Sequence, residues 1–347
     1  MSERLIRVLL VEDVQTVALL LKEILESDPR IQVADVVESG EDALARLDTL
    51  HVDLVLMDIH LPGMNGFETT RQIMQTAPVP IVICSATADP HDLAITFEAM
   101  EAGALAVFAK PASPVHPDFE QMRDHLLATV RAMSEVKLVR RRPHRPPAPR
   151  STMPVPRTTS AQVVVIGAST GGPPVLRTIL SALPRDLPVP VLVVQHIAAG
   201  FLGGLVDWLS QEAALPTRIA RSCEKLLPGH VYFAPDGHHL RIHPSGCATL
   251  RRGAPHELLC PSVAQLFQSA TEVYHGAVVA VLLTGMGRDG AAELATLHNC
   301  GAITIAQDKE TSVVHGMPGE AIRLGAASMI LPAHEIAPQI RKIFRVP

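Results

Sequence analysis

Short apolar segments that alternate with helical patterns constrain this chain of 347 residues more than any other feature. In the first half, strand candidates lie at 5–11, 31–37, 53–58, 80–84 and 105–109, and helix candidates at about 15–27, 41–50, 66–76, 90–102 and 118–138. The strand candidates are rich in Val, Ile and Leu, and the longer segments between them have apolar residues at helical spacing. Five β/α units in succession predict a doubly wound parallel sheet.

The alternation stops at residues 139–160, where six Pro and six Arg occur without hydrophobic periodicity, as is typical of an extended linker. It resumes at 161, with strand candidates at 162–167, 189–195, 230–234, 277–283, 302–306 and 328–331, helix candidates at 173–183, 200–213, 261–273, 288–299 and 334–344, and two short runs near 238–251 that suggest a hairpin. We therefore predict an α/β protein. Residues 1–138 form a five-stranded doubly wound domain, and residues 161–347 form a second doubly wound, mostly parallel domain.

Composition narrows the class of protein. Aromatic residues make up only 3% of the chain, which argues against stacking platforms for single-stranded nucleic acid. The five Cys are scattered and form no CxxC pair, which favours a reducing compartment. The apolar run at the N-terminus is too short for a signal peptide, and no apolar stretch is long enough to span a bilayer. We expect a cytoplasmic protein with no direct membrane insertion.

Charge is unevenly distributed along the chain. Residues 1–138 carry 10 Lys and Arg against 22 Asp and Glu, whereas the linker carries six Arg and no acid. Residues 161–347 are nearly balanced, with 14 basic and 13 acidic residues. This distribution has two explanations that suit it equally well. The acidic domain, the basic tether and the near-neutral domain interact or compete for one surface, or the surface charge simply differs between the domains.

Polar residues follow the strand candidates of the first half. They are Glu12 and Asp13 after the first strand, Asp58 at the end of the third, Ser85 after the fourth and Lys110 after the fifth. Because the carboxyl ends of parallel strands share one edge of the sheet, these side chains converge. Clustered carboxylates suit Mg²⁺, and the ion, a lysine and a hydroxyl together can accommodate a phosphoryl group. Any one of these residues alone is more simply a solvated loop residue, but that explanation does not suit five polar residues at four strand ends.

This pattern resembles the receiver domain of two-component response regulators across residues 4–125. The resemblance implies that Asp58 accepts a phosphoryl group from a histidine kinase. The other implied roles are Mg²⁺ ligation by Glu12, Asp13, Asp58 and the backbone carbonyl of His60, and phosphate sensing by Ser85 and Lys110. One departure is Val107, with Phe108 beside it, because receivers carry a switch aromatic at the position of Val107.

Three strand candidates of the second half end beside a nucleophilic, a basic and an acidic residue. They are VVVIGASTGG with Ser169, VLVVQHI with His196 and VVAVLLTGMGRDG with Asp289. A serine nucleophile needs a base to take its proton, and the base needs a carboxylate to fix its tautomer, so the set predicts a catalytic triad. Singly, Ser169 reads as a helix cap, His196 as a structural residue and Asp289 as a cap for 290–299.

The segment around Ser169 can be compared with other known motifs. Residues 167–171 fit G-x-S-x-G between a strand and a helix. A Walker A loop fails because Pro173 and Pro174 follow and no Lys is present, and the Rossmann fingerprint does not fit. The chain order Ser, His, Asp differs from that of the α/β-hydrolases, so that fold is excluded.

Together with PGHVYFAPDGHH at 228–239 and TIAQDKETSVVHGMPGEA at 304–321, these segments resemble the catalytic domain of the CheB family of chemotaxis protein-glutamate methylesterases, across 161–333. The implied roles are nucleophile for Ser169, general acid/base for His196, orientation of that base for Asp289, oxyanion stabilisation for the backbone N–H of Met286, and pocket shape for Thr170. No cofactor is implied in this domain.

The resemblance implies a phosphorylation-activated hydrolase that demethylates glutamate γ-methyl esters, and deamidates glutamines, on methylated chemoreceptors. In the unphosphorylated state the receiver would cover the triad. The family stretch H-R-P-S-V-D reads L-C-P-S-V-A at 259–264, and Pro173 and Pro174 replace a T-E pair. These departures leave the triad intact and bear on the choice of substrate.

Two other functions compete with this interpretation. A receiver with a degenerate output domain would bind without hydrolysing, but the complete triad argues against it. A DNA-binding response regulator is suggested only by the Arg-rich linker. No helix-turn-helix pattern follows that linker, and the output domain has almost no net charge, so we expect no nucleic-acid partner.

Overall fold

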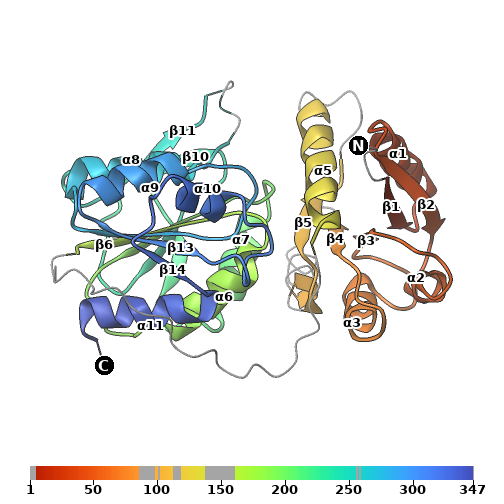
Figure 1. Ribbon diagram of the computed structural model, residues 1–347, viewed down its shortest axis with the longest axis horizontal. Coiled ribbons are helices and arrows are strands. Elements are labelled where there is room, and N and C mark those ends of the chain that lie inside the picture. Colours follow the sequence, from red (N-terminus) through yellow and green to blue (C-terminus); the bar gives the residue numbers. More distant parts are fainter. Residues whose placement is uncertain are drawn as a thin grey trace.

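The computed structural model describes residues 5–85, 98–100, 102–111, 119–136, 161–254, 257 and 259–346. The predicted linker over 139–160 lies outside the described residues, as does most of the helix predicted over 90–102. The described chain forms two α/β lobes, each built around its own sheet (Figure 1). No helix in the described ranges is both long enough and apolar enough to cross a membrane.

The first lobe contains a five-stranded parallel sheet with the strand order β2-β1-β3-β4-β5. Its strands are β1 (Ile6–Val11), β2 (Ile31–Val37), β3 (Leu54–Asp58), β4 (Ile81–Ser85) and β5 (Ala106–Ala109), and its described helices are α1 (Gln15–Glu26), α2 (Gly40–Leu47), α3 (Gly66–Thr76) and α5 (Phe119–Ser134). Alternate strand residues enter two apolar clusters, Leu10 and Leu56 in one and Leu9 and Val55 in the other. Both faces of the sheet are therefore covered, as predicted for a doubly wound sheet.

The second lobe contains a seven-stranded parallel sheet, in the order β14-β13-β12-β6-β7-β9-β8, and a separate antiparallel hairpin, β10-β11. The strands are β6 (Val163–Ala168), β7 (Val191–Gln195), β8 (Thr217–Ile219), β9 (Val231–Phe233), β10 (His238–Ile242), β11 (Ala248–Arg252), β12 (Val278–Leu282), β13 (Ile303–Gln307) and β14 (Met329–Leu331). The helices are α6 (Gly172–Ala182), α7 (Leu202–Ser210), α8 (Val263–Tyr274), α9 (Ala291–Asn299), α10 (Met317–Arg323) and α11 (Ala333–Phe344). Apolar clusters cover both faces of the sheet, which confirms the predicted fold class.

Two elements of the second lobe were not predicted, β8 and α10. Strand β8 is a three-residue edge strand whose side chains are all half-buried, so it has no alternation of buried and exposed positions. Helix α10 has seven residues, with Pro318 and Gly319 near its start. Both elements are too short for a hydrophobic period to appear in the sequence.

The first lobe faces the second through its edge strand β5 and its helix α5 (Figure 1). From β5, Val107 and Ala109 pack against an apolar cluster of the second sheet. From the loop between β13 and α10, Val313 and Val314 pack against an apolar cluster of the first sheet. We call these four residues the interdomain contact.

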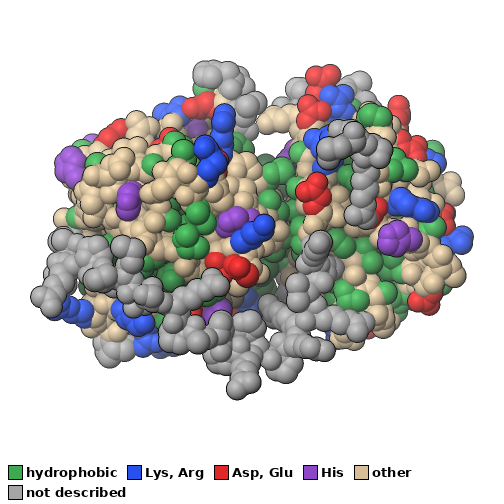
Figure 2. All heavy atoms as spheres, in the orientation of Figure 1, with side chains coloured by type: hydrophobic (Ala, Val, Ile, Leu, Met, Phe, Trp, Pro, Cys, Tyr) green, Lys and Arg blue, Asp and Glu red, His purple; other side chains and the backbone are tan. Residues whose placement is uncertain are grey.

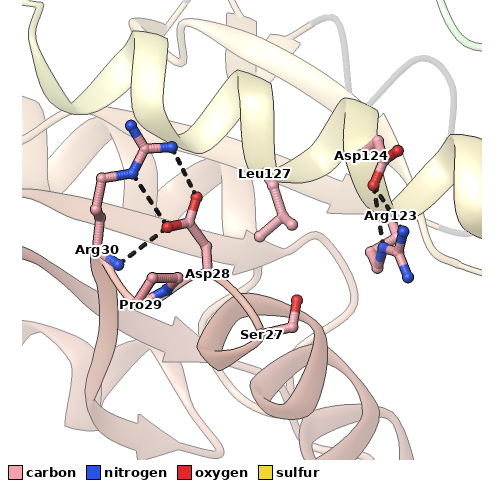
Figure 3. A pocket seen from close by; sticks show the side chains of 7 residues that line it. All are labelled: Ser27, Asp28, Pro29, Arg30, Arg123, Asp124 and Leu127. Carbon is pink, nitrogen blue, oxygen red and sulfur yellow. Dashed lines mark hydrogen bonds and ion pairs between the residues drawn. The ribbon is translucent and has the colours of Figure 1, made fainter.

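Helix α5 is tied to the turn between α1 and β2 through Asp28. Its carboxylate accepts bonds from the Arg30 backbone at 2.9 Å and from the Arg30 guanidinium at 3.1 Å (Figure 3). Arg131 of α5 also donates to it, at 2.5 Å. These bonds, above all those from the Arg30 side chain, hold the pKa of Asp28 well below its usual range. The position of α5 therefore depends on a charged Asp28.

Candidate functional site

Ser169 follows the end of β6, where the chain turns sharply into α6. Gly171 has a φ of +75°, which an L side chain rarely adopts, and it allows this turn. The Gly172 N–H donates to the Ser169 carbonyl at 2.8 Å. Ser169 is 9% exposed and lies at the N-terminus of α6, where the helix dipole favours negative charge. The turn thus presents a hydroxyl beside groups that stabilise an anion.

His196 and Asp289 follow the two strands that flank β6. His196 comes directly after β7, and Asp289 lies in the loop between β12 and α9. The His196 Nε2 is 2.9 Å from the Asp289 Oδ2, and both side chains are largely buried. This pairing uses Nε2 and leaves Nδ1 of the ring for a second partner. No hydrogen bond joins Ser169 to His196 within the described residues, as is common before substrate binds.

Asp289 is held in its ionised form. Burial alone would raise the pKa of this carboxyl group, but the hydrogen bond to His196 and the backbone N–H groups of Val263 and Ala264 outweigh it. The pKa of Asp289 therefore lies below its usual value. A carboxylate that stays charged at neutral pH can orient an imidazole and stabilise the imidazolium.

The loop at 284–287 lies against Ser169. The Gly285 N–H donates to the Val314 carbonyl at 2.9 Å, whereas the Met286 N–H donates to no described residue. A Cβ added at Gly285 would lie 2.6 Å from the Ser169 Cβ. Glycine at this position therefore permits a backbone approach to Ser169 that an L side chain would block.

Gln195 bonds to both Ser169 and His196, and it was not singled out from the sequence. It is buried at the end of β7, and its amide Nε2 donates to the carbonyls of Ser169 and His196, each at 2.8 Å. Thr284 acts similarly, because its Oγ1 donates to the Thr170 carbonyl at 2.9 Å. The sequence feature that could have identified Gln195 is its polar side chain at the end of an apolar strand, directly before His196.

The acidic residues of the first lobe do converge. Oxygens of Glu12, Asp13 and Asp58 lie within 4.8 Å of one another, and Glu12 and Asp58 are almost fully buried. The Lys110 Nζ is 2.9 Å from the Glu12 Oε1 and 2.7 Å from the Asp58 Oδ2. Ser85 ends β4 and is buried, and the His60 N–H donates to the Asp58 Oδ1 at 3.3 Å.

This group carries more negative than positive charge. Burial raises the pKa of Glu12, with a partial offset from its bond to Lys110. For Lys110, burial acts to lower the pKa, but bonds to Asp58 and Glu12 outweigh it and the pKa is raised. Three carboxylates facing one ammonium are a set of oxygen ligands that fits a hard divalent cation such as Mg²⁺.

Family models match both lobes of the chain. The family model of the CheB methylesterases matches residues 164–340, and that of the response regulator receiver domain matches residues 8–116. The chain belongs to the CheB methylesterase family. The resemblance stated from the sequence is thereby confirmed.

Two relatives are similar over nearly the whole chain, and one solved structure is similar over its second half. Protein-glutamate methylesterase/protein-glutamine glutaminase 1 of Syntrophus aciditrophicus is 49% identical over 98% of each chain. The relative from Nitrosospira multiformis that carries the same name is 49% identical over 96% of this chain and 95% of its own. The crystal structure of the Thermotoga maritima CheB methylesterase catalytic domain covers 53% of this chain and 99% of its own, at 37% identity and a TM-score of 0.51.

In this CheB family member the interdomain contact lies beside the Ser169 turn. A Cβ added at Gly171 would be 2.5 Å from the Cβ of Val313, which packs on the first lobe. From α5, His125 interacts electrostatically with His196, and its ring centroid is 5.5 Å from that of Phe108. Burial, with a smaller contribution from His196, lowers the pKa of His125. The first lobe therefore adjoins the candidate active site.

Proposed function

We propose that this chain is a phosphorylation-regulated protein-glutamate methylesterase and protein-glutamine glutaminase that acts on methylated chemoreceptors. The observation that carries the proposal is the 2.9 Å pairing of His196 with Asp289 beside the Ser169 turn. The name of relatives at 49% identity supports the same activity. The non-hydrolytic alternative is not favoured, because it gives no reason for a buried base paired with a carboxylate.

The chemistry follows from the side chains of the proposed triad. His196 takes the proton of the Ser169 hydroxyl as its oxygen attacks the γ-carbonyl carbon of the ester. The oxyanion is stabilised by the Met286 N–H and the N-terminus of α6. His196 returns the proton to the departing methoxide, so methanol leaves and an acyl-enzyme remains. His196 then deprotonates a water that attacks the acyl-enzyme, and it returns this proton to the Ser169 oxygen as the carboxylate is released. With a glutamine substrate, ammonia leaves in place of methanol.

We assign the control of this activity to the first lobe. Glu12, Asp13 and Asp58, with the backbone carbonyl of His60, would hold Mg²⁺. The bound ion would neutralise charge on the carboxylates and on an incoming phosphoryl group. Asp58 accepts that group from a histidine kinase, and Ser85 and Lys110 contact its oxygens.

We assign residues 1–138 to the receiver domain, 139–160 to the linker and 161–347 to the catalytic domain. In the unphosphorylated chain the receiver covers the triad through the interdomain contact, and phosphorylation of Asp58 loosens it. Val107 belongs to that contact although receivers carry a switch aromatic at its position. The signal therefore passes through the packing of β5 rather than through a rotating ring.

Basic and acidic side chains are interspersed on the face drawn in Figure 2, rather than grouped by sign. This distribution gives no support to a nucleic-acid footprint on that face. It agrees with the assignment of the protein partners to chemoreceptors and a kinase.

Methanol release from methylated receptor membranes tests the proposal. We expect release that rises with a small phosphodonor and is lost in Ser169→Ala. We also expect residues 161–347 alone to be more active than the unphosphorylated full chain. A wild type without release on any chemoreceptor would favour the non-hydrolytic alternative. Equal activity of the fragment and the unphosphorylated full chain would contradict the covering of the triad by the receiver.

A further inference from the structure

Asp289 is bonded by more than His196. The Ser262 Oγ donates to its Oδ1 at 2.9 Å. The Val263 N–H donates to Oδ2 at 2.6 Å and the Ala264 N–H to Oδ1 at 3.1 Å. Each carboxylate oxygen therefore has two partners, so rotation of the carboxyl group would break several bonds at once.

These three donors form the start of α8. Ser262 is the N-cap residue of that helix, yet it makes no side-chain cap bond to the helix itself. The Asp289 carboxylate takes the place of a cap by accepting the first N–H groups of α8 from another part of the chain. The positive end of the helix dipole therefore faces the carboxylate that pairs with His196.

The start of α8 is packed directly against the strand that carries the nucleophile. A Cβ added at Gly167 of β6, or at Gly290 beside Asp289, would lie 2.4 Å from the Val263 Cγ1. The first turn of α8 thus contacts the backbone next to Ser169 and next to Asp289. A shift of this turn would displace both.

We propose that Ser262 is a positioning residue of the catalytic site, which fixes the Asp289 carboxylate so that Oδ2 faces His196 and shares its charge with α8. This inference rests on the proposed triad. Ala264 takes part only through its backbone N–H, so the loss of the family Asp at that position leaves the arrangement intact. The departures at Leu259 and Cys260 likewise leave the Ser262 hydroxyl in place.

The test compares Ser262→Ala with Ser262→Thr in the full chain, activated with a saturating small phosphodonor. A hydrogen bond to a charged group is lost in the Ala variant, so we expect kcat to fall about tenfold or more with KM unchanged. The carboxylate charge, no longer shared with a hydroxyl, should hold a proton on His196 more tightly. The acid limb of the pH profile should then move to higher pH. Thr keeps the hydroxyl and should restore both quantities.

Ser269→Ala is the matched control. Ser269 is a buried serine on the same helix whose hydroxyl bonds to Ile242 and Leu266 and not to Asp289. We expect its loss to lower stability without moving the pH profile. A Ser262→Ala enzyme with wild-type kcat and pH profile would overturn the proposal. So would equal losses of kcat in Ser262→Ala and Ser269→Ala with unshifted profiles, because that result indicates a merely structural role.

A second readout separates this inference from the proposed function. In a Ser169→Ala background, NMR of the His196 ring follows its protonation without turnover. The ring should keep its proton to higher pH when Ser262→Ala is added. His125, whose pKa is lowered by burial and to a smaller extent by His196, is unchanged in both variants. If the ring titration shifts but the chain with Ser169 intact has no esterase activity, the proposed function alone is refuted. An unshifted one in an active enzyme would refute the role of Ser262.

Discussion

Replacement of Gly285 by Ala tests how closely the loop at 284–287 must approach Ser169, the proposed nucleophile. The new Cβ would lie 2.6 Å from the Ser169 Cβ and 2.4 Å from the Met317 Sδ. The Gly285 carbonyl also accepts the N–H groups of Gly316 and Met317, at 3.1 and 2.9 Å. The loop therefore cannot retreat without loss of backbone bonds, and of the two contacts only the flexible but buried Met317 side chain could adjust without breaking one.

The size of the effect follows from these distances. Carbon atoms are in favourable contact at about 3.5–4.0 Å, so the two Cβ atoms must separate by about 1 Å. Overpacking of this kind costs about 1–3 kcal/mol of stability. A displacement of about 1 Å at a reacting group costs about 100-fold in rate. We expect Gly285→Ala to stay folded, with kcat lowered about 100-fold.

Steady-state hydrolysis of the receptor methyl ester measures this change, and thermal unfolding measures the stability. Gly203→Ala is the control, because Gly203 lies in α7 with no atom near its added Cβ. That variant should be as active as wild type and slightly more stable. A wild-type kcat in Gly285→Ala would refute this prediction, because Ser169 would then tolerate an added methyl group on the neighbouring loop.

Three further predictions concern the first lobe. Burial, and to a smaller extent the charge of His196 across the interdomain contact, lower the pKa of His125, so the closed contact favours its neutral form. This stabilisation is present above about pH 6.5 and is lost as the pH falls. The ratio of basal to phosphodonor-activated activity should therefore rise in acid, and His125→Leu should abolish the rise. Chelation of divalent ions, or Asp58→Asn, should remove activation by phosphodonor and leave basal methanol release unchanged; full activation in either case would contradict the proposed Mg²⁺ site. Since the pKa of Asp28 is depressed, its stabilising effect is present above about pH 4 and is lost as the pH falls towards its lowered pKa. Asp28→Asn should therefore flatten the acid side of the stability curve measured by chemical unfolding, and an unchanged curve would show that the Arg30 bonds do not matter.

The sequence predicted the candidate site well because its residues follow parallel strands. Ser169, His196 and Asp289 come after β6, β7 and β12, which are neighbours in the sheet, so a correct strand assignment brings them to one edge. Their catalytic roles remain predictions. Gln195 and Ser262 could not be assigned from the sequence, because their importance lies in bonds to residues 26 or 27 positions away.

Strand β5 limits how interchangeable the first lobe can be. Val107 packs within its own lobe and against the second, so one short edge strand has to satisfy two cores at once. A receiver grafted from another response regulator could accept phosphate normally and still dock badly, because the switch aromatic expected at this position is much larger than valine. Exchange of receiver domains between such proteins would then yield constitutively active enzymes, unless the β5 sequence that matches the catalytic domain is kept.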